Sequence, residues 1–133
     1  MILISVFLIV SCGTPGVKGK RQRLCRQWEL QAFEEPVINK DSVSVIKTTY
    51  PKPVYFKFEV NGELEVDYSD SLIESYVWKF VNTNVIKISP NNSPRINSKI
   101  LGEFEVHFLS RSSNLFLQRR NTNHNGIMLV PAK

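Results

Sequence analysis

The chain has 133 residues, with seventeen Lys and Arg against twelve Asp and Glu, and a formal net charge of +5. That length allows one domain, and an apolar content of 42% with 11% aromatic residues excludes a disordered chain. Five basic residues and no acid precede Gln27, whereas the rest of the chain carries twelve residues of each sign. The surplus charge is therefore local and does not predict a nucleic-acid-binding surface.

The chain begins with an uncharged apolar run, residues 2–10 (ILISVFLIV). This run is shorter than the roughly 20 residues that span a bilayer, and its length is typical of a signal-peptide core. The sequence Ile-Val-Ser-Cys that ends at Cys12 resembles a bacterial lipobox. The resemblance implies that a lipoprotein signal peptide, residues 1–11, is removed and that Cys12 is acylated, with palmitate among the chains. Acylation would anchor the protein to a membrane. The alternative is a buried first strand in which Cys12 is an ordinary small apolar residue.

The next segment, residues 13–27, contains three glycines and Pro15, which favour an irregular tether. We therefore expect a lipidated basic tether over residues 12–23 and a folded domain over residues 24–133. Basic side chains close to an anchor can each contribute up to about 1 kcal/mol to the attraction of anionic head groups. The residues predicted to be membrane-proximal in this way are Lys18, Lys20, Arg21, Arg23 and Arg26.

From Leu24 onward, apolar residues recur at every second position, which predicts β-strands. A first strand is expected to place Leu24, Trp28, Leu30 and Ala32 on one face. Further strands are expected at residues 42–49, 54–60, 63–68, 75–81, 85–89, 99–109 and 115–119, and residues 127–130 allow a ninth. Asn61 and Gly62 predict a type I′ hairpin turn. The sequence therefore predicts an all-β fold, an antiparallel up-and-down barrel of eight to nine strands.

Four short motifs carry a family resemblance: Leu24-x-x-x-Trp28-x-Leu30, the Phe-rich stretch 58–62, Tyr76-x-Trp78, and the closing hairpin over residues 104–117. Together they resemble the lipocalin-like domains of lipoproteins from Bacteroidetes-type bacteria. The resemblance implies an eight-stranded barrel whose interior can hold a small apolar ligand, and it implies no established reaction.

Five aromatic residues share the inward parity of their strands and are the candidate ligand pocket: Trp28, Phe56, Phe58, Tyr76 and Trp78. The leading hypothesis is a lipid-anchored envelope protein that binds a small apolar ligand or an envelope component. The alternative is that the same side chains fill the barrel completely. A filled barrel would be a structural or protein-interaction module of the cell envelope without a ligand.

Signals for catalysis are weak. His107 and His124 lack Cys or carboxylate neighbours at the spacing of a metal site, so no metal and no cofactor is expected. The alternating acids of residues 63–67 are interpreted as the solvent face of a hairpin. Cys25 loses its one possible disulfide partner if Cys12 is acylated, and is interpreted as a packing residue. We therefore predict a protein that is not an enzyme.

Two further signals concern the envelope. The triplets that begin at Asp41 and Asp70 place Ser42 and Ser71 in short O-glycosylation signals of the kind known from Bacteroidetes envelope proteins. Gly13 follows the lipobox-like cysteine with no acidic cluster behind it, which favours a periplasm-facing protein over export to the cell surface. Of the two envelope membranes, we expect the outer one rather than the inner one. The expected partners are the membrane, a small apolar ligand or an envelope protein, and no nucleic acid.

Overall fold

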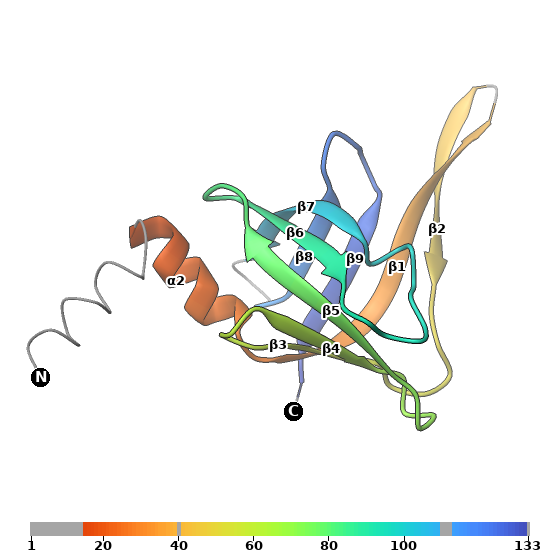
Figure 1. The fold of residues 1–133 in the computed structure, drawn as a ribbon. Helices are drawn as coiled ribbons and strands as arrows, with labels where there is room; N and C mark the ends of the chain where they lie inside the picture. Colours follow the sequence, from red (N-terminus) through yellow and green to blue (C-terminus); the bar gives the residue numbers. More distant parts are fainter. Residues whose placement is uncertain (1–14, 40, 110–112, 133) are drawn as a thin grey trace, which may run out of the picture.

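The computed structural model describes residues 15–39, 41–109 and 113–132, in which one helix precedes nine strands (Figure 1). Cys12 and the proposed signal peptide lie outside the described residues. The helix, α2, spans Pro15–Leu24. The strands are β1 (Gln27–Asn39), β2 (Ser42–Thr48), β3 (Tyr55–Phe58), β4 (Glu63–Asp67), β5 (Ile73–Phe80), β6 (Val85–Pro90), β7 (Gly102–Phe108), β8 (Leu115–Arg119) and β9 (Gly126–Pro131).

The strands form one antiparallel sheet in the order β2-β1-β3-β4-β5-β6-β7-β8-β9, and a further pairing of β1 with β9 closes it. Eight strands therefore make a closed barrel, and β2 is an additional strand attached to β1. The first residues of β1 pair with β3, and Phe33–Asn39 at its other end pair with β2. The predicted fold class, an antiparallel up-and-down barrel of eight to nine strands, is confirmed.

The alternation of apolar and polar residues determines which side chains form the core. On β4, Leu64 and Val66 are buried whereas Glu63 and Glu65 are exposed, so one face of the strand meets the interior and the other meets water. The same alternation recurs around the barrel. The largest fully buried side chains are Trp28, Tyr76, Phe33, Phe56, Phe58, Phe104, Leu24, Leu64, Ile86, Ile88, Ile100 and Leu115.

The β3–β4 hairpin is present, but its turn differs from the predicted type I′. The N–H of Gly62 donates to the carbonyl oxygen of Glu59 at 3.0 Å, and Gly62 alone in this turn has a positive φ, of 94°. A type I turn followed by a left-handed glycine fits this pattern, so the loop has three residues instead of two. The additional residue, Val60, is 70% exposed.

The helix α2 replaces the irregular tether predicted for this part of the chain. Pro15 stands at the first helical position, where its missing N–H costs no hydrogen bond. Gly16 and Gly19 each cost about 1 kcal/mol relative to Ala. Contacts with the barrel offset that cost, because Leu24 in the last turn is fully buried in the core. Leu24 is thus inward-facing, as expected, but from the helix and not from β1.

Candidate functional site

The five aromatic residues proposed as a ligand pocket lie in the barrel interior, and each is exposed by 3% or less. The Trp28 indole N–H donates to the carbonyl oxygen of Leu24 at 3.0 Å. The Trp78 indole N–H donates to the carbonyl oxygens of Glu59 at 3.2 Å and Glu63 at 3.0 Å. The rings of Phe58 and Trp78 pack edge to face, with centroids 5.5 Å apart. The indole N–H groups therefore have backbone hydrogen-bond partners, and the Phe58 and Trp78 rings pack against each other, as is usual for core residues.

Basic side chains of α2 and the segment after it cover one end of the barrel, the helix end. The Arg21 guanidinium lies 4.9 Å from the Trp78 ring centroid, and its NH2 group donates to the carbonyl oxygen of Val60. Lys20 donates from Nζ to the carbonyl oxygen of Thr83 at 2.9 Å and also to the side chain of Asn84. These contacts fix the helix to the turns of the β3–β4 and β5–β6 hairpins.

Two more of the basic residues proposed to lie near a membrane also contact aromatic rings. Arg23 lies 3.9 Å from the centroid of Phe108, and Arg26 lies 5.1 Å from that of Trp28. Such cation–π contacts contribute about 0.5–1 kcal/mol when exposed. Lys18 lies within the helix. Contacts with the barrel thus give a structural role to four of these basic residues, Lys20, Arg21, Arg23 and Arg26, which sequence reasoning did not anticipate.

The opposite end, the loop end, contains a buried carboxylate that sequence reasoning missed. Glu74 on β5 is 1% exposed. Its Oε1 accepts hydrogen bonds from the hydroxyls of Tyr68 at 2.9 Å and Tyr76 at 2.6 Å, and its Oε2 lies 3.2 Å from Nε of Arg95. Burial, with the Glu74 carboxylate as a further cause, raises the pKa of both tyrosines well above the ordinary value, so both remain hydrogen-bond donors.

The β6–β7 loop, residues 91–101, is fastened to this cluster. The N–H of Asn97 donates to the Tyr76 hydroxyl at 2.8 Å, and its side-chain amide donates to the Tyr68 hydroxyl at 3.1 Å. Ile100, in the same loop, is fully buried in the core. The loop therefore closes the loop end of the barrel with an apolar side chain, and the polar cluster around Glu74 holds the loop in place.

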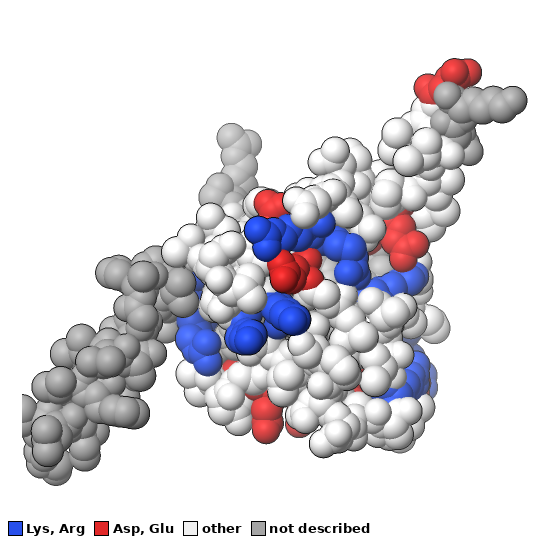
Figure 2. Space-filling view, turned by 45° about the horizontal axis from the view of Figure 1, so that its top comes forward, with Lys and Arg blue, Asp and Glu red and all other residues white. Residues whose placement is uncertain are grey.

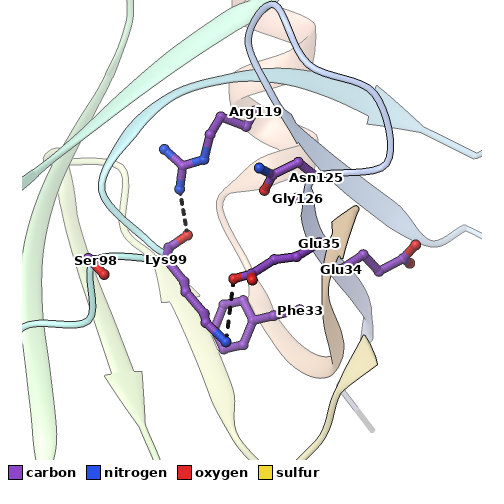
Figure 3. A pocket seen from close by; sticks show the side chains of 8 residues that line it. All are labelled: Phe33, Glu34, Glu35, Ser98, Lys99, Arg119, Asn125 and Gly126. Carbon is purple, nitrogen blue, oxygen red and sulfur yellow. Dashed lines mark hydrogen bonds and ion pairs between the residues drawn. The ribbon is translucent and has the colours of Figure 1, made fainter. Parts of the chain in front are cut away.

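A second set of contacts holds the same loop from the other side, around a hollow of about 170 Å³ (Figure 3). Arg119 on β8 donates to the carbonyl oxygens of Leu101 at 2.8 Å and Lys99 at 3.1 Å. Lys99 in turn lies 3.5 Å from the Glu35 carboxylate on β1. The hollow is smaller than the 300–1,000 Å³ that ligand pockets usually have, and three of its four charged side chains already have partners, namely Glu35, Lys99 and Arg119. A larger hollow of about 440 Å³ lies on the outside of the barrel beside residues 82–85. The five aromatic residues line neither hollow.

The β1–β2 hairpin extends beyond the barrel (Figure 1). The β1–β9 ladder ends at Glu34, but β1 continues to Asn39 and returns as β2. Opposed residues of an antiparallel pair share a face. One face of the hairpin is therefore apolar, and we call it the valine face; its members are Pro36, Ile38, Val43 and Val45.

Other residues singled out in the sequence lie apart from one another. His107 and His124 are exposed, and the described residues contain no group of three or more His, Cys, Asp or Glu side chains suited to a metal. Cys25 is half-buried at the end of the helix, and burial raises the pKa of its thiol. The triplet serines Ser42 and Ser71 are both exposed. No described helix has the length and apolar character needed to cross a bilayer.

Comparisons with protein-family models, with curated proteins and with solved structures return no match.

The sequence held one signal for the buried cluster. Glu74 has the same parity as Tyr76 and Trp78, which were predicted to point inward. Extending the strand back by two residues, to the Ile73 at which β5 begins, would have placed a carboxylate inside the barrel. Arg95 and Asn97 lie in a Pro- and Asn-rich loop whose position only the fold reveals.

Proposed function

We propose that this chain is a lipid-anchored module of the bacterial cell envelope, in which a filled, non-enzymatic barrel presents a projecting hairpin to a protein partner. The observation that supports it best is the packing of the interior. The five candidate pocket residues are exposed by 3% or less and pack against one another, and Ile100 closes the loop end. Of the two interpretations drawn from the sequence, this packing favours the filled barrel over the ligand carrier.

The hairpin supports the docking part of the proposal. Ile38 is 80% exposed and Val43 60%, on a part of the sheet that extends past the barrel body. Apolar side chains that project together from a soluble domain are typical of an interaction site. The lipobox at Cys12 supports the envelope anchor, since two or more acyl chains hold a protein on a membrane essentially permanently.

Three measurements test the proposal. Cys12→Ala should move the protein from the membrane to the soluble fraction and abolish incorporation of labelled palmitate. Native mass spectrometry of the protein extracted from its own membranes should give the mass of the acylated chain, or twice that mass, with no bound small molecule. A stoichiometric apolar molecule in that spectrum would instead favour the ligand carrier.

Docking is tested by a photocrosslinking amino acid at Ile38, with the same amino acid at Val77 as the matched control. Val77 is an apolar residue on the outer face of β5 and is 39% exposed. We expect protein adducts from position 38 and not from position 77, and we expect Val45→Lys to abolish them. Absence of adducts at position 38 would contradict the docking role.

A further inference from the structure

The outer edge of β2 is an exposed sheet edge. Within the described residues, β2 pairs with β1 alone and is the outermost strand of the sheet, so its second edge faces solvent. All of its residues except Thr48 are exposed. An unpaired edge presents a row of N–H and C=O groups that can accept another strand. Natural proteins usually protect such edges with proline, charge or a covering segment.

The two free edges of the hairpin differ in that protection. On β1, the part beyond Glu34 also lacks a β9 partner, and it contains Pro36, which has no N–H to donate to an incoming strand. The β2 sequence Ser-Val-Ser-Val-Ile-Lys-Thr contains no proline, and its one charge, Lys47, lies next to its end. The hairpin thus blocks one edge and leaves the other open.

The open edge is complementary to itself. In an antiparallel pairing of β2 with β2 of a second copy, centred on Ser44, each Val43 faces Val45 of the second copy. The same register places Asp41 opposite Lys47 of the second copy, and the two-fold axis repeats both pairs. Cross-strand apolar pairs and opposite charges each stabilise a sheet, whereas like charges directly opposite would weaken it. This register contains no like-charge pair.

The register also joins the two valine faces. Within one hairpin, Ile38 lies opposite Val43 and Pro36 lies opposite Val45. Pairing of the two β2 strands then gives four-residue rows of apolar side chains across a four-stranded ribbon. Figure 2 shows the stem of the projecting hairpin as largely white on the side in view, with acidic atoms at its tip. The hairpin extends past the barrel, which leaves room for a second copy beside it (Figure 1).

We infer that the partner of this hairpin is a second copy of the same chain, bound through antiparallel pairing of the two β2 edges about Ser44. The inference rests on the proposed docking function and names its partner. The pairing is a β-augmentation in which backbone hydrogen bonds give affinity and the side-chain pairs at Val43, Val45, Asp41 and Lys47 set the register.

Cysteine crosslinking tests the register in the full chain, with Cys12 and Cys25 replaced by serine and the protein held in detergent. Ser44→Cys places two thiols directly opposite each other, where the Cα separation of about 4.5–5.5 Å suits a disulfide. Ser42→Cys is the matched control, since it is the same residue type on the same face of the same strand. In this register, residue 42 faces Ile46 of the second copy, so its own counterpart lies about 13 Å further along the strand. Mild oxidation should give covalent dimers from the first variant and not from the second.

Sedimentation of the unmodified chain and two variants tests the affinity. Val45→Lys should raise the dimer dissociation constant by about tenfold or more, because two apolar pairs are lost by symmetry. Val77→Lys, at a residue of nearly equal exposure on β5, should leave the dimer dissociation constant unchanged. Equal crosslinking of both cysteine variants, a species larger than a dimer, or equal dissociation constants would overturn the inference.

The same photocrosslinking amino acid at Val43, which faces the second copy directly in this register, separates the two proposals. A Val43 adduct with a second copy supports both of them. An adduct with a different protein overturns the second-copy inference and supports the docking function. No adduct at all overturns both.

Discussion

Removal of the Glu74 carboxylate should destabilise the barrel and release the β6–β7 loop. In Glu74→Ala, the hydroxyls of Tyr68 and Tyr76 lose their shared acceptor, and an unsatisfied buried donor costs about 1–3 kcal/mol. Loss of one partner from a fully buried ion pair costs about 3–5 kcal/mol. The side chain of Arg95 is 43% exposed, so water can solvate its charge and the lower part of these ranges applies. We expect a loss of about 3 kcal/mol in the free energy of unfolding.

Two variants isolate the cause. Glu74→Gln keeps one carbonyl oxygen that both tyrosine hydroxyls can share and loses the charge toward Arg95, so about 1 kcal/mol is expected. Glu65→Ala, on the exposed face of neighbouring β4, should change the free energy by no more than about 0.5 kcal/mol. Urea denaturation followed by tryptophan fluorescence measures all three values.

Limited proteolysis reports on the loop itself. Trypsin cleaves after basic residues, and Arg95 and Lys99 lie in the β6–β7 loop. Glu74→Ala should accelerate cleavage at both positions, whereas Glu65→Ala should leave the rate of cleavage unchanged. If Glu74→Ala were as stable and as resistant as Glu65→Ala, the carboxylate would not hold the loop, and the interpretation of this cluster would be wrong.

Three further substitutions follow from the same structure. Leu24→Ala should cost about 2–5 kcal/mol by urea denaturation, because the side chain is fully buried, whereas a residue of a free tether would cost almost nothing. The pKa of Tyr68 and of Tyr76 is raised in the folded state, so their stabilisation is complete below about pH 10 and is lost as the pH rises through the higher folded value. Unfolding free energies measured from pH 8 to 12 should therefore decline less steeply in Tyr76→Phe than in the unmodified chain. Gly126→Ala should lower the melting temperature by several degrees, because the new Cβ would lie 2.1 Å from the carbonyl oxygen of Leu117.

The barrel strands could be predicted because each has one face in the core and one in water. On β4 the alternation of burial follows the alternation of the sequence, with Leu64 and Val66 buried and Glu63 and Glu65 exposed. The Glu74 cluster could not be predicted in the same way. A carboxylate at an inward position interrupts the apolar alternation, so the predicted strand began only after Glu74. Its burial depends on Tyr68 and Arg95, which the fold brings from a neighbouring strand end and a distant loop.

Two elements were predicted incorrectly or incompletely for a different reason. The helix α2 contains glycine and proline, which locally disfavour a helix, and its stability comes from tertiary contacts of Arg21 and Leu24. The β1–β2 hairpin was predicted as two ordinary strands. Alternation of valines in β2 predicts a strand with one buried face. The pattern does not show whether that face is buried within the same chain or against another molecule.

The antiparallel register and the proposed anchor together constrain how a dimer sits on a membrane. β1 runs from the helix end to the tip of the hairpin, and its thirteen residues span about 40 Å at 3.3 Å per residue. Antiparallel pairing of the β2 edges therefore points the helix ends of the two copies in opposite directions. Two anchors can then reach one membrane only if the four-stranded ribbon lies along its surface, and a ribbon that stands upright would join two membranes.

We expect the first arrangement, because the eleven residues from Gly13 to Arg23 give the anchor a short reach and the exposed Arg23 and Arg26 lie at the helix end. Vesicles that carry the acylated Ser44→Cys chain should form covalent dimers on oxidation within each vesicle, and their size by light scattering should not change. Clustering of the vesicles that Val45→Lys abolishes would show that the ribbon stands upright. Covalent dimers that form as readily with the Ser42→Cys chain would mean that crowding on the membrane, and not pairing of the β2 edges, brings the cysteines together.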